Sequence, residues 1–141
     1  MDYREFKAKQ EEEFNEFSKD NIIVILEFSK EEALAKLEAE GLTTKDIVNL
    51  GSGCYLKKEA IPEYNELVKR HDKEYHEYLL ANVYDVVFYE LANYETEISL
   101  SYSYNDVLTK IIGLTPEEIE ANKDVIDKAI ADYKEDFYKY N

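Results

Sequence analysis

The sequence predicts a mostly helical α+β fold in a single globular domain, residues 1–141, with a small sheet of two or three strands. Apolar residues recur at spacings of three and four over several long stretches, which is typical of amphipathic helices. One β-branched run, residues 22–28, has the length of a strand. With 141 residues and 45% hydrophobic content, the chain is large and apolar enough for one compact core.

The first predicted helix covers residues 2–19. Asp2 and Glu5 have the spacing of a capping box, in which each side chain binds the other residue's backbone N–H. The apolar stripe of this helix consists of Tyr3, Phe6, Gln10, Phe14 and Phe17.

The run Ile22–Phe28 is too apolar for a sheet edge, so we expect a central strand there. Ser29 and Glu32 then have N-cap spacing for a second helix. Gly41 should terminate this helix, because glycine readily adopts the left-handed conformation found after helix ends.

Residues 43–49 read as a short helical turn, and the glycines of residues 51–53 predict a tight turn into a second strand, Cys54–Lys57. Pro62 favours a first helical turn, so the next helix should begin near Ala60. Its stripe consists of Tyr64, Leu67, Val68, His71, Tyr75, Tyr78 and Leu79.

Residues 80–91 are apolar on more than one face, which predicts a core helix. The alternating segment 97–102 predicts a third strand, and a helix should run over 105–113. Thr-Pro-Glu-Glu at 115–118 is a helix start signal. The last helix, 124–138, should direct a final apolar set into the core: Val125, Ile126, Ala129, Ile130, Tyr133 and Phe137.

The chain is strongly acidic, with 32 acids against 17 bases, a net charge of −15 and a pI near 4.5. This field repels nucleic acid and anionic membranes and attracts basic proteins, so neither direct nucleic-acid binding nor a membrane partner is expected. No apolar run reaches the roughly 18 residues of a membrane span. The single Cys54 and the absence of a signal-peptide pattern favour the cytoplasm. A surface kept acidic only for solubility is the alternative.

Residues 74–109 contain seven tyrosines and seven acids but no lysine or arginine. We assign Tyr84 and Tyr89 to the core, but buried hydroxyls need hydrogen-bond partners, so other tyrosines should be exposed. Surface tyrosine among carboxylates suits an arginine-rich partner. We therefore predict a tyrosine–carboxylate face that binds a basic host protein, made of Tyr94, Glu95, Glu97, Tyr102, Tyr104 and Asp106.

A sharper hypothesis is nucleic-acid mimicry, in which rows of carboxylates occupy a phosphate-binding groove of the partner. Ordinary solvated helix faces are the alternative. Two helical rows have the required charge: Glu11, Glu12, Glu13 and Glu16, and Glu117, Glu118, Glu120, Asp124 and Asp127.

No catalytic or metal-binding motif emerges. His71 and His76 are five residues apart and diverge by about 140° on a helix, which splits the only cluster with metal-ligand chemistry. Cys54 lacks a nucleophile signature, and residues 51–53 lack the endings of known phosphate loops. We therefore expect no metal, no cofactor and no enzymatic activity.

The segments "NLGSGCYLKK" and "FYELANYETEISL", with "EFKAKQEEEF" near the start, resemble a family of small acidic proteins of bacteriophages and mobile elements. That family carries a motif close to "YELANHEY", and Tyr94 and Glu95 stand here at its His-Glu position. Cys54 and Tyr55 replace its Gly-Phe pair. A role for that histidine would be lost in this chain. The resemblance implies a phage or mobile-element setting.

These observations predict a non-enzymatic interaction protein that binds and inhibits a host protein, one that handles nucleic acid or serves in defence. One alternative is a module for a small ligand such as a nucleotide signal, bound by Lys57, Lys58, Arg70 and the amides of residues 51–53. Another is a phage structural or assembly component. The sequence leaves open whether the chain forms a homodimer.

Overall fold

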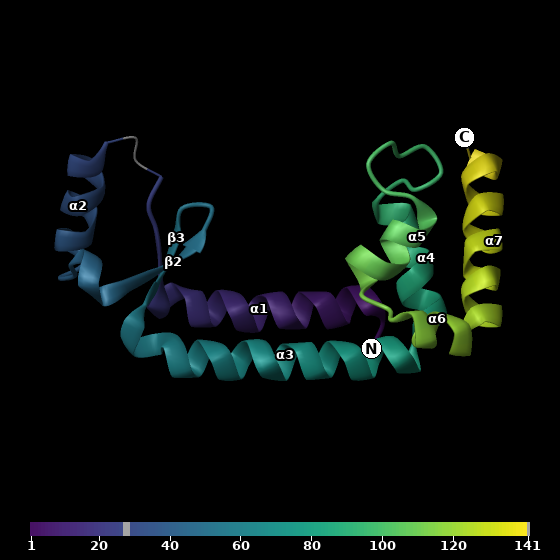
Figure 1. Ribbon diagram of the computed structural model, residues 1–141, viewed down its shortest axis with the longest axis horizontal. Helices are drawn as coiled ribbons and strands as arrows, with labels where there is room; N and C mark the ends of the chain where they lie inside the picture. The colour runs from purple at the N-terminus through teal and green to yellow at the C-terminus, as the bar shows by residue number, and fades with distance from the viewer. Residues whose placement is uncertain (27–28, 141) are drawn as a thin grey trace. The chain divides into compact units, whose positions relative to one another are not determined.

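The computed structural model describes residues 1–26 and 29–140 (Figure 1). Seven α-helices and one three-stranded antiparallel sheet account for most of them, which confirms the predicted mostly helical α+β class. The elements are α1 (Tyr3–Asn21), β1 (Ile22–Val24), α2 (Lys30–Ala39), η1 (Thr44–Asp46), β2 (Ile47–Gly51), β3 (Cys54–Lys57), η2 (Lys58–Ala60), α3 (Ile61–Ala81), α4 (Val83–Asn93), α5 (Tyr104–Asp106), η3 (Val107–Ile112), α6 (Pro116–Ala121) and α7 (Lys123–Tyr140).

The described residues form two units, one of residues 7–73 and one of residues 1–6 with 74–141. Each unit has its own apolar cluster, whereas the composition led us to expect one core. The long helices α1 and α3 explain the difference, because each supplies apolar side chains to both clusters. None of the described helices combines the length and apolarity needed to cross a membrane.

In the unit of residues 7–73 the strand order is β1-β3-β2, so β3 is central. The prediction of a central strand at 22–28 is therefore wrong: β1 ends at Val24 and lies at the edge. Val24 is 45% exposed and Leu26 is also exposed, because β3 is the only strand beside β1 and no strand pairs with its other edge among the described residues. Glu27 and Phe28, the end of the predicted strand, lie outside the described residues.

The β2–β3 hairpin is closed by residues 51–53, as predicted, and β3 has the predicted bounds. All three turn residues have positive φ: 95° at Gly51, 53° at Ser52 and 78° at Gly53. The helical turn predicted over 43–49 is shorter than expected, because η1 ends at Asp46 and the next residues pair with β3.

Local capping signals define the first two helices. The Asp2 Oδ1 atom accepts a hydrogen bond from the Glu5 N–H at 2.8 Å, and the Asp2 N–H donates to Glu5 Oε2 at 3.2 Å, which confirms the capping box of α1. At α2, the Ser29 hydroxyl accepts from the Glu32 N–H at 3.1 Å.

The small apolar cluster of the unit of residues 7–73 is built on three buried side chains with four half-buried neighbours: Phe17, Leu56 and Ala60, with Ile22, Ile61, Tyr64 and Leu67.

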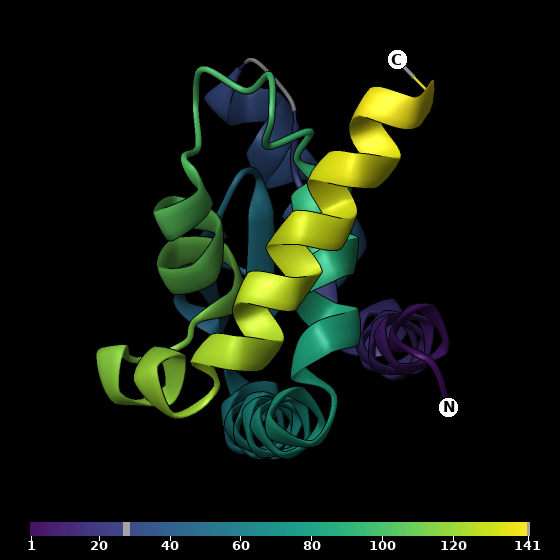
Figure 2. The same cartoon turned by 90° about the vertical axis from the view of Figure 1, so that its right-hand side faces the viewer.

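The second unit is organised around α4, which confirms the predicted core helix. Val86, Val87 and Leu91 are completely buried, and α7 packs across α4 (Figure 2). From α7, Ile126, Ala129 and Tyr133 are buried, but Val125 is 42% exposed, contrary to prediction. It precedes the buried stripe by one position and so points to another side of the helix.

The third strand predicted at 97–102 is absent; the segment is a turn and irregular loop that follows α4. Ile98 is 60% exposed and Leu100 is fully exposed. Thr96 closes the end of α4 instead, because both its hydroxyl (2.9 Å) and its N–H (3.0 Å) donate to the Leu91 carbonyl. Among the described residues, no strand lies beside this alternating segment to pair with it.

The remaining C-terminal predictions are confirmed. The helix expected over 105–113 consists of α5 followed by η3, a π-helical turn that ends at Gly113 in the left-handed conformation. Thr115 caps α6 through a complete capping box with Glu118.

Candidate functional site

The predicted tyrosine–carboxylate face centres on Glu97. Its carboxylate accepts hydrogen bonds from the hydroxyls of Tyr104 and Tyr138, the second at 2.6 Å, and its backbone N–H donates to the Tyr133 hydroxyl at 3.2 Å. The bonds from the Tyr104 and Tyr138 hydroxyls lower the pKa of Glu97, with Tyr104 the main cause, and burial raises the pKa of Tyr104. A carboxylate held by two phenols stays charged at neutral pH.

Helix α7 completes this cluster with two residues that the sequence did not reveal, Lys134 and Tyr138. The Lys134 ammonium lies 4.9 Å from the centre of the Tyr104 ring, a cation–π contact. The two residues are four apart and so lie on one side of α7. Their distance in sequence from residues 94–106 left no local signal for their participation.

The other members of the face have different environments. Tyr94 and Tyr102 pack edge to face, with ring centres 5.4 Å apart, and both are half-buried. Glu95 is exposed and has a φ of 47°. Asp106 forms local bonds: its carboxylate accepts from the N–H of the N-cap residue Ser103 at 3.1 Å and lies 3.2 Å from the Lys110 ammonium.

The loop of this face also exposes two apolar side chains, Ile98 and Leu100. Both were predicted to lie on the buried side of a strand, because apolar residues that alternate with polar ones normally mark that side. The face therefore combines exposed aliphatic carbon, half-buried tyrosine rings and an exposed carboxylate.

The two carboxylate rows are only partly solvated. Glu11, Glu12 and Glu16 are exposed, but Glu13 forms an ion pair with Arg70 at 2.5 Å. Its pKa is lowered, mainly by the hydrogen bond from Arg70.

In the second row, Glu118 is half-buried, accepts a hydrogen bond from the Thr115 N–H at 2.9 Å and lies 2.8 Å from His76 Nε2. Glu117 and Glu120 of α6 and Asp124 and Asp127 of α7 are exposed. Glu13 and Glu118 are thus paired within the chain, and nucleic-acid mimicry by these two rows stays a prediction.

The histidines engage different carboxylates: His71 Nε2 lies 3.4 Å from Glu13, whereas His76 contacts Glu118. Arg70 and His71 both contact the Oε2 atom of Glu13. Cys54 is half-buried in β3 opposite Val24.

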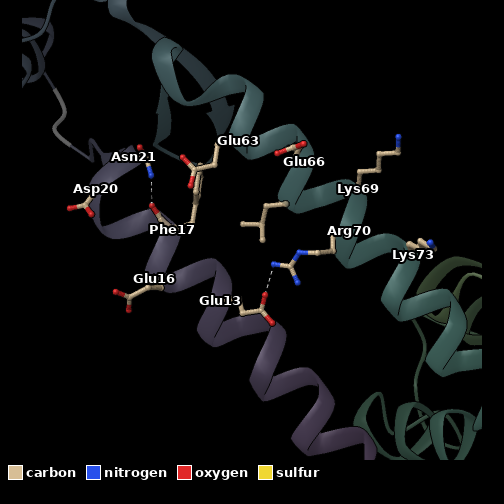
Figure 3. Close-up of a pocket in the computed structure, with 11 residues that line it drawn as sticks. Glu13, Glu16, Phe17, Asp20, Asn21, Glu63, Glu66, Lys69, Arg70 and Lys73 are labelled. Carbon is tan, nitrogen blue, oxygen red and sulfur yellow. Dashed lines mark hydrogen bonds and ion pairs between the residues drawn. The ribbon is translucent and has the colours of Figure 1, made fainter.

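A groove of about 900 Å³ lies in the unit of residues 7–73 (Figure 3). Phe17 and Leu67 supply its apolar surface, and Glu13 and Arg70 are joined across it. Its other charged lining residues are Glu16, Asp20, Glu63, Glu66, Lys69 and Lys73.

Of the anion donors predicted from the sequence, Arg70 alone lines this groove, and Lys57, Lys58 and residues 51–53 do not. Five carboxylates and three cations line the groove, and Arg70 is paired with Glu13, so the net negative charge of the lining disfavours a phosphate-bearing ligand. The small-ligand alternative stays a prediction, and the residues named for it are not gathered in this groove.

The ionisation of tyrosine tests the hydrogen bonds formed by Tyr75 and Tyr84. Burial raises the pKa of Tyr75 to about 12, and its hydroxyl donates to the Ile112 carbonyl at 2.7 Å. The bond from Tyr84 to Asp132, at 2.6 Å, raises the pKa of Tyr84 to about 12. Since an unfolded tyrosine titrates near 10, the stability these groups contribute is complete below pH 10 and is lost as pH rises towards 12.

We therefore expect a spectrophotometric titration of tyrosinate to show a late phase near pH 12, accompanied by a fall in the melting temperature from pH 10 upward. The chain contains no tryptophan to obscure the signal. Tyr84→Phe should reduce the late phase. Complete ionisation of all tyrosines near pH 10 would contradict the described contacts.

The structure thus defines a mostly helical, acidic α+β protein with a tyrosine–carboxylate cluster on the unit of residues 1–6 and 74–141. Residues 2–135 match a protein family described as a family of unknown function (DUF7659), and the chain belongs to that family. No curated protein and no solved structure shows a significant match.

Proposed function

We propose that this chain is a non-enzymatic protein of phage or mobile-element origin that acts in the host cytoplasm by binding and inhibiting a basic host protein. The observation that carries the proposal is the loop of the tyrosine–carboxylate face, where Ile98 and Leu100 are exposed between tyrosines and carboxylates. Protein interfaces commonly combine a desolvated centre with a polar rim, and tyrosine is enriched in them.

The chemistry of the face indicates what a partner must supply. Leu100 and Ile98 would enter an apolar depression, while the exposed Glu95 would pair with an arginine or lysine at its edge. The contact of Lys134 with Tyr104 beside Glu97 illustrates how a cation is accommodated by this combination of ring and carboxylate. A net charge of −15 would speed the encounter with such a partner.

A partner that handles nucleic acid or serves in host defence fits this charge. The exposed Glu11, Glu12 and Glu16 of α1 are a further acidic surface that suits a phosphate-binding groove. Inhibition would then result from competition with the nucleic acid, and added salt should weaken the complex.

The test is affinity capture of the tagged protein from a nuclease-treated bacterial host lysate, read by mass spectrometry. A double variant, Glu95→Lys with Leu100→Asp, should lose a stoichiometric basic partner that the parent chain retains. Both positions are exposed, so the fold should persist, as circular dichroism would verify.

The matched control is Glu38→Lys, a charge reversal at an exposed position of α2 outside the face. This variant should keep the partner. If the double variant bound the partner as strongly as Glu38→Lys, the face would be rejected as the binding site.

A further inference from the structure

A second hollow, of about 370 Å³, lies within the unit of residues 1–6 and 74–141. It falls within the size range of small-molecule sites. Its lining comes from the start of α1 and from one side of α4: Asp2, Tyr3, Arg4, Tyr84, Asp85, Phe88, Tyr89 and Ala92. None of these residues belongs to the tyrosine–carboxylate face, so the hollow is a separate site.

Aromatic rings dominate this hollow. Tyr84 and Phe88, four residues apart on α4, stack with ring centres 6.1 Å apart and planes inclined by 20°. Tyr89 meets Tyr3 edge to face at 5.1 Å. Positions 84, 85, 88 and 89 share one side of the helix because residues at spacings of three and four are neighbours. Three rings of α4 thus line one hollow.

Two of these rings already hold cations from the chain itself. The Arg4 guanidinium carbon lies 5.6 Å from the centre of the Tyr89 ring, and the Lys128 ammonium lies 5.9 Å from that of Tyr84. Aromatic faces attract cations through their quadrupoles, most strongly where water is excluded. Asp85, exposed at the rim, adds a negative charge that a cation would pair with.

We propose that this hollow is a binding site for a guanidinium-bearing cation, of the type that an arginine side chain presents. The planar guanidinium lies against the aromatic wall of Tyr84 and Phe88 and pairs with the Asp85 carboxylate. Guanidinium stacks on aromatic faces and forms forked hydrogen bonds with carboxylates, which ammonium does less well. Arg4 and Lys128 are internal competitors, because the Arg4 guanidinium lies over the Tyr89 ring and the Lys128 ammonium lies over the Tyr84 ring. Arg4 also adds positive charge to the lining.

The experiment is an NMR titration of the intact chain with Nα-acetyl-arginine amide, compared with the citrulline analogue, its neutral isostere. We expect shift changes at the amides of residues 84–92 and about tenfold tighter binding of the arginine compound, since a cation–π contact together with charge pairing has that magnitude. Equal binding of the two compounds would overturn the proposal.

Three variants separate binding from folding. Asp85→Asn should weaken arginine amide binding about fivefold, and Arg4→Gln should strengthen it, a gain that damage to the fold would not produce. Glu38→Gln, at an exposed position of α2, is the matched control and should leave the affinity unchanged. If Asp85→Asn had no effect, or if Arg4→Gln weakened binding, the site would be rejected.

Two sources of the cation are distinguished in the same titration. If an arginine-containing tripeptide binds more tightly than methylguanidine, the site takes an arginine side chain. If the two bind equally, it takes a free guanidinium compound. Both outcomes support the site, and the absence of binding by either probe would overturn it.

Discussion

Leu91→Ala is expected to lower the free energy of unfolding by about 3 kcal/mol. Leu91 lies in the last turn of α4 and is completely buried among the apolar residues that surround this helix. Truncation removes its transfer free energy and leaves a cavity, because the neighbouring helix α7 can follow only partly. Urea unfolding followed by circular dichroism measures the loss.

Leu100→Ala makes the same chemical change at a residue that is fully exposed. It should alter the free energy of unfolding by no more than about 0.5 kcal/mol. Similar losses for the two variants would mean that residues 97–102 are buried after all, as the predicted third strand required. This pair of variants therefore tests whether residues 97–102 form an exposed loop in place of the predicted third strand.

Most helices were predictable because their signals are local. The caps at Asp2, Ser29 and Thr115 each rest on residues within one turn, and each forms the bonds that its spacing predicts. The turn at 51–53 is equally local, since glycine at its two ends permits positive φ.

Strands were predicted less well because a strand exists only through its partner. Residues 97–102 alternate as a half-buried strand would, yet no neighbouring strand is present to accept their hydrogen bonds among the described residues. The run at 22–28 is apolar enough for a central strand, but the β2–β3 hairpin leaves only one edge of β3 for it. Neither fact is contained in the local pattern.

The same distinction applies to the candidate site. The excess of tyrosine and carboxylate between residues 74 and 109 was visible in the sequence, but their pairing was not. Tyr138 reaches Glu97 across 41 residues, and Arg4 reaches Tyr89 from the start of α1. Such contacts follow from how α1, α4 and α7 pack, so composition predicted the kind of surface and the structure supplied its arrangement.

Gly53→Ala is expected to disrupt the pairing of β1 with β3. Gly53 has a φ of 78°, and a Cβ atom there would lie 2.9 Å from the Ile25 carbonyl oxygen and 2.5 Å from Leu26 Cδ2. The Leu26 side chain is exposed and can rotate away, but the carbonyl is backbone, and the Ile25 N–H donates to the Gly53 carbonyl at 2.7 Å. Relief of the clash therefore requires the backbone at Ile25, directly after β1, to move.

Gly51→Ala is the matched control, because Gly51 has a φ of 95° but no atom within 4 Å of the position that a Cβ would occupy. It should incur only the backbone penalty of a left-handed residue, about 1 kcal/mol. Gly53→Ala should exceed it by a further ~1–3 kcal/mol, the cost of overpacking a closed site. Hydrogen exchange at the Ile25 amide measures the difference, and equal protection in the two variants would show that β1 does not depend on its close approach to the hairpin.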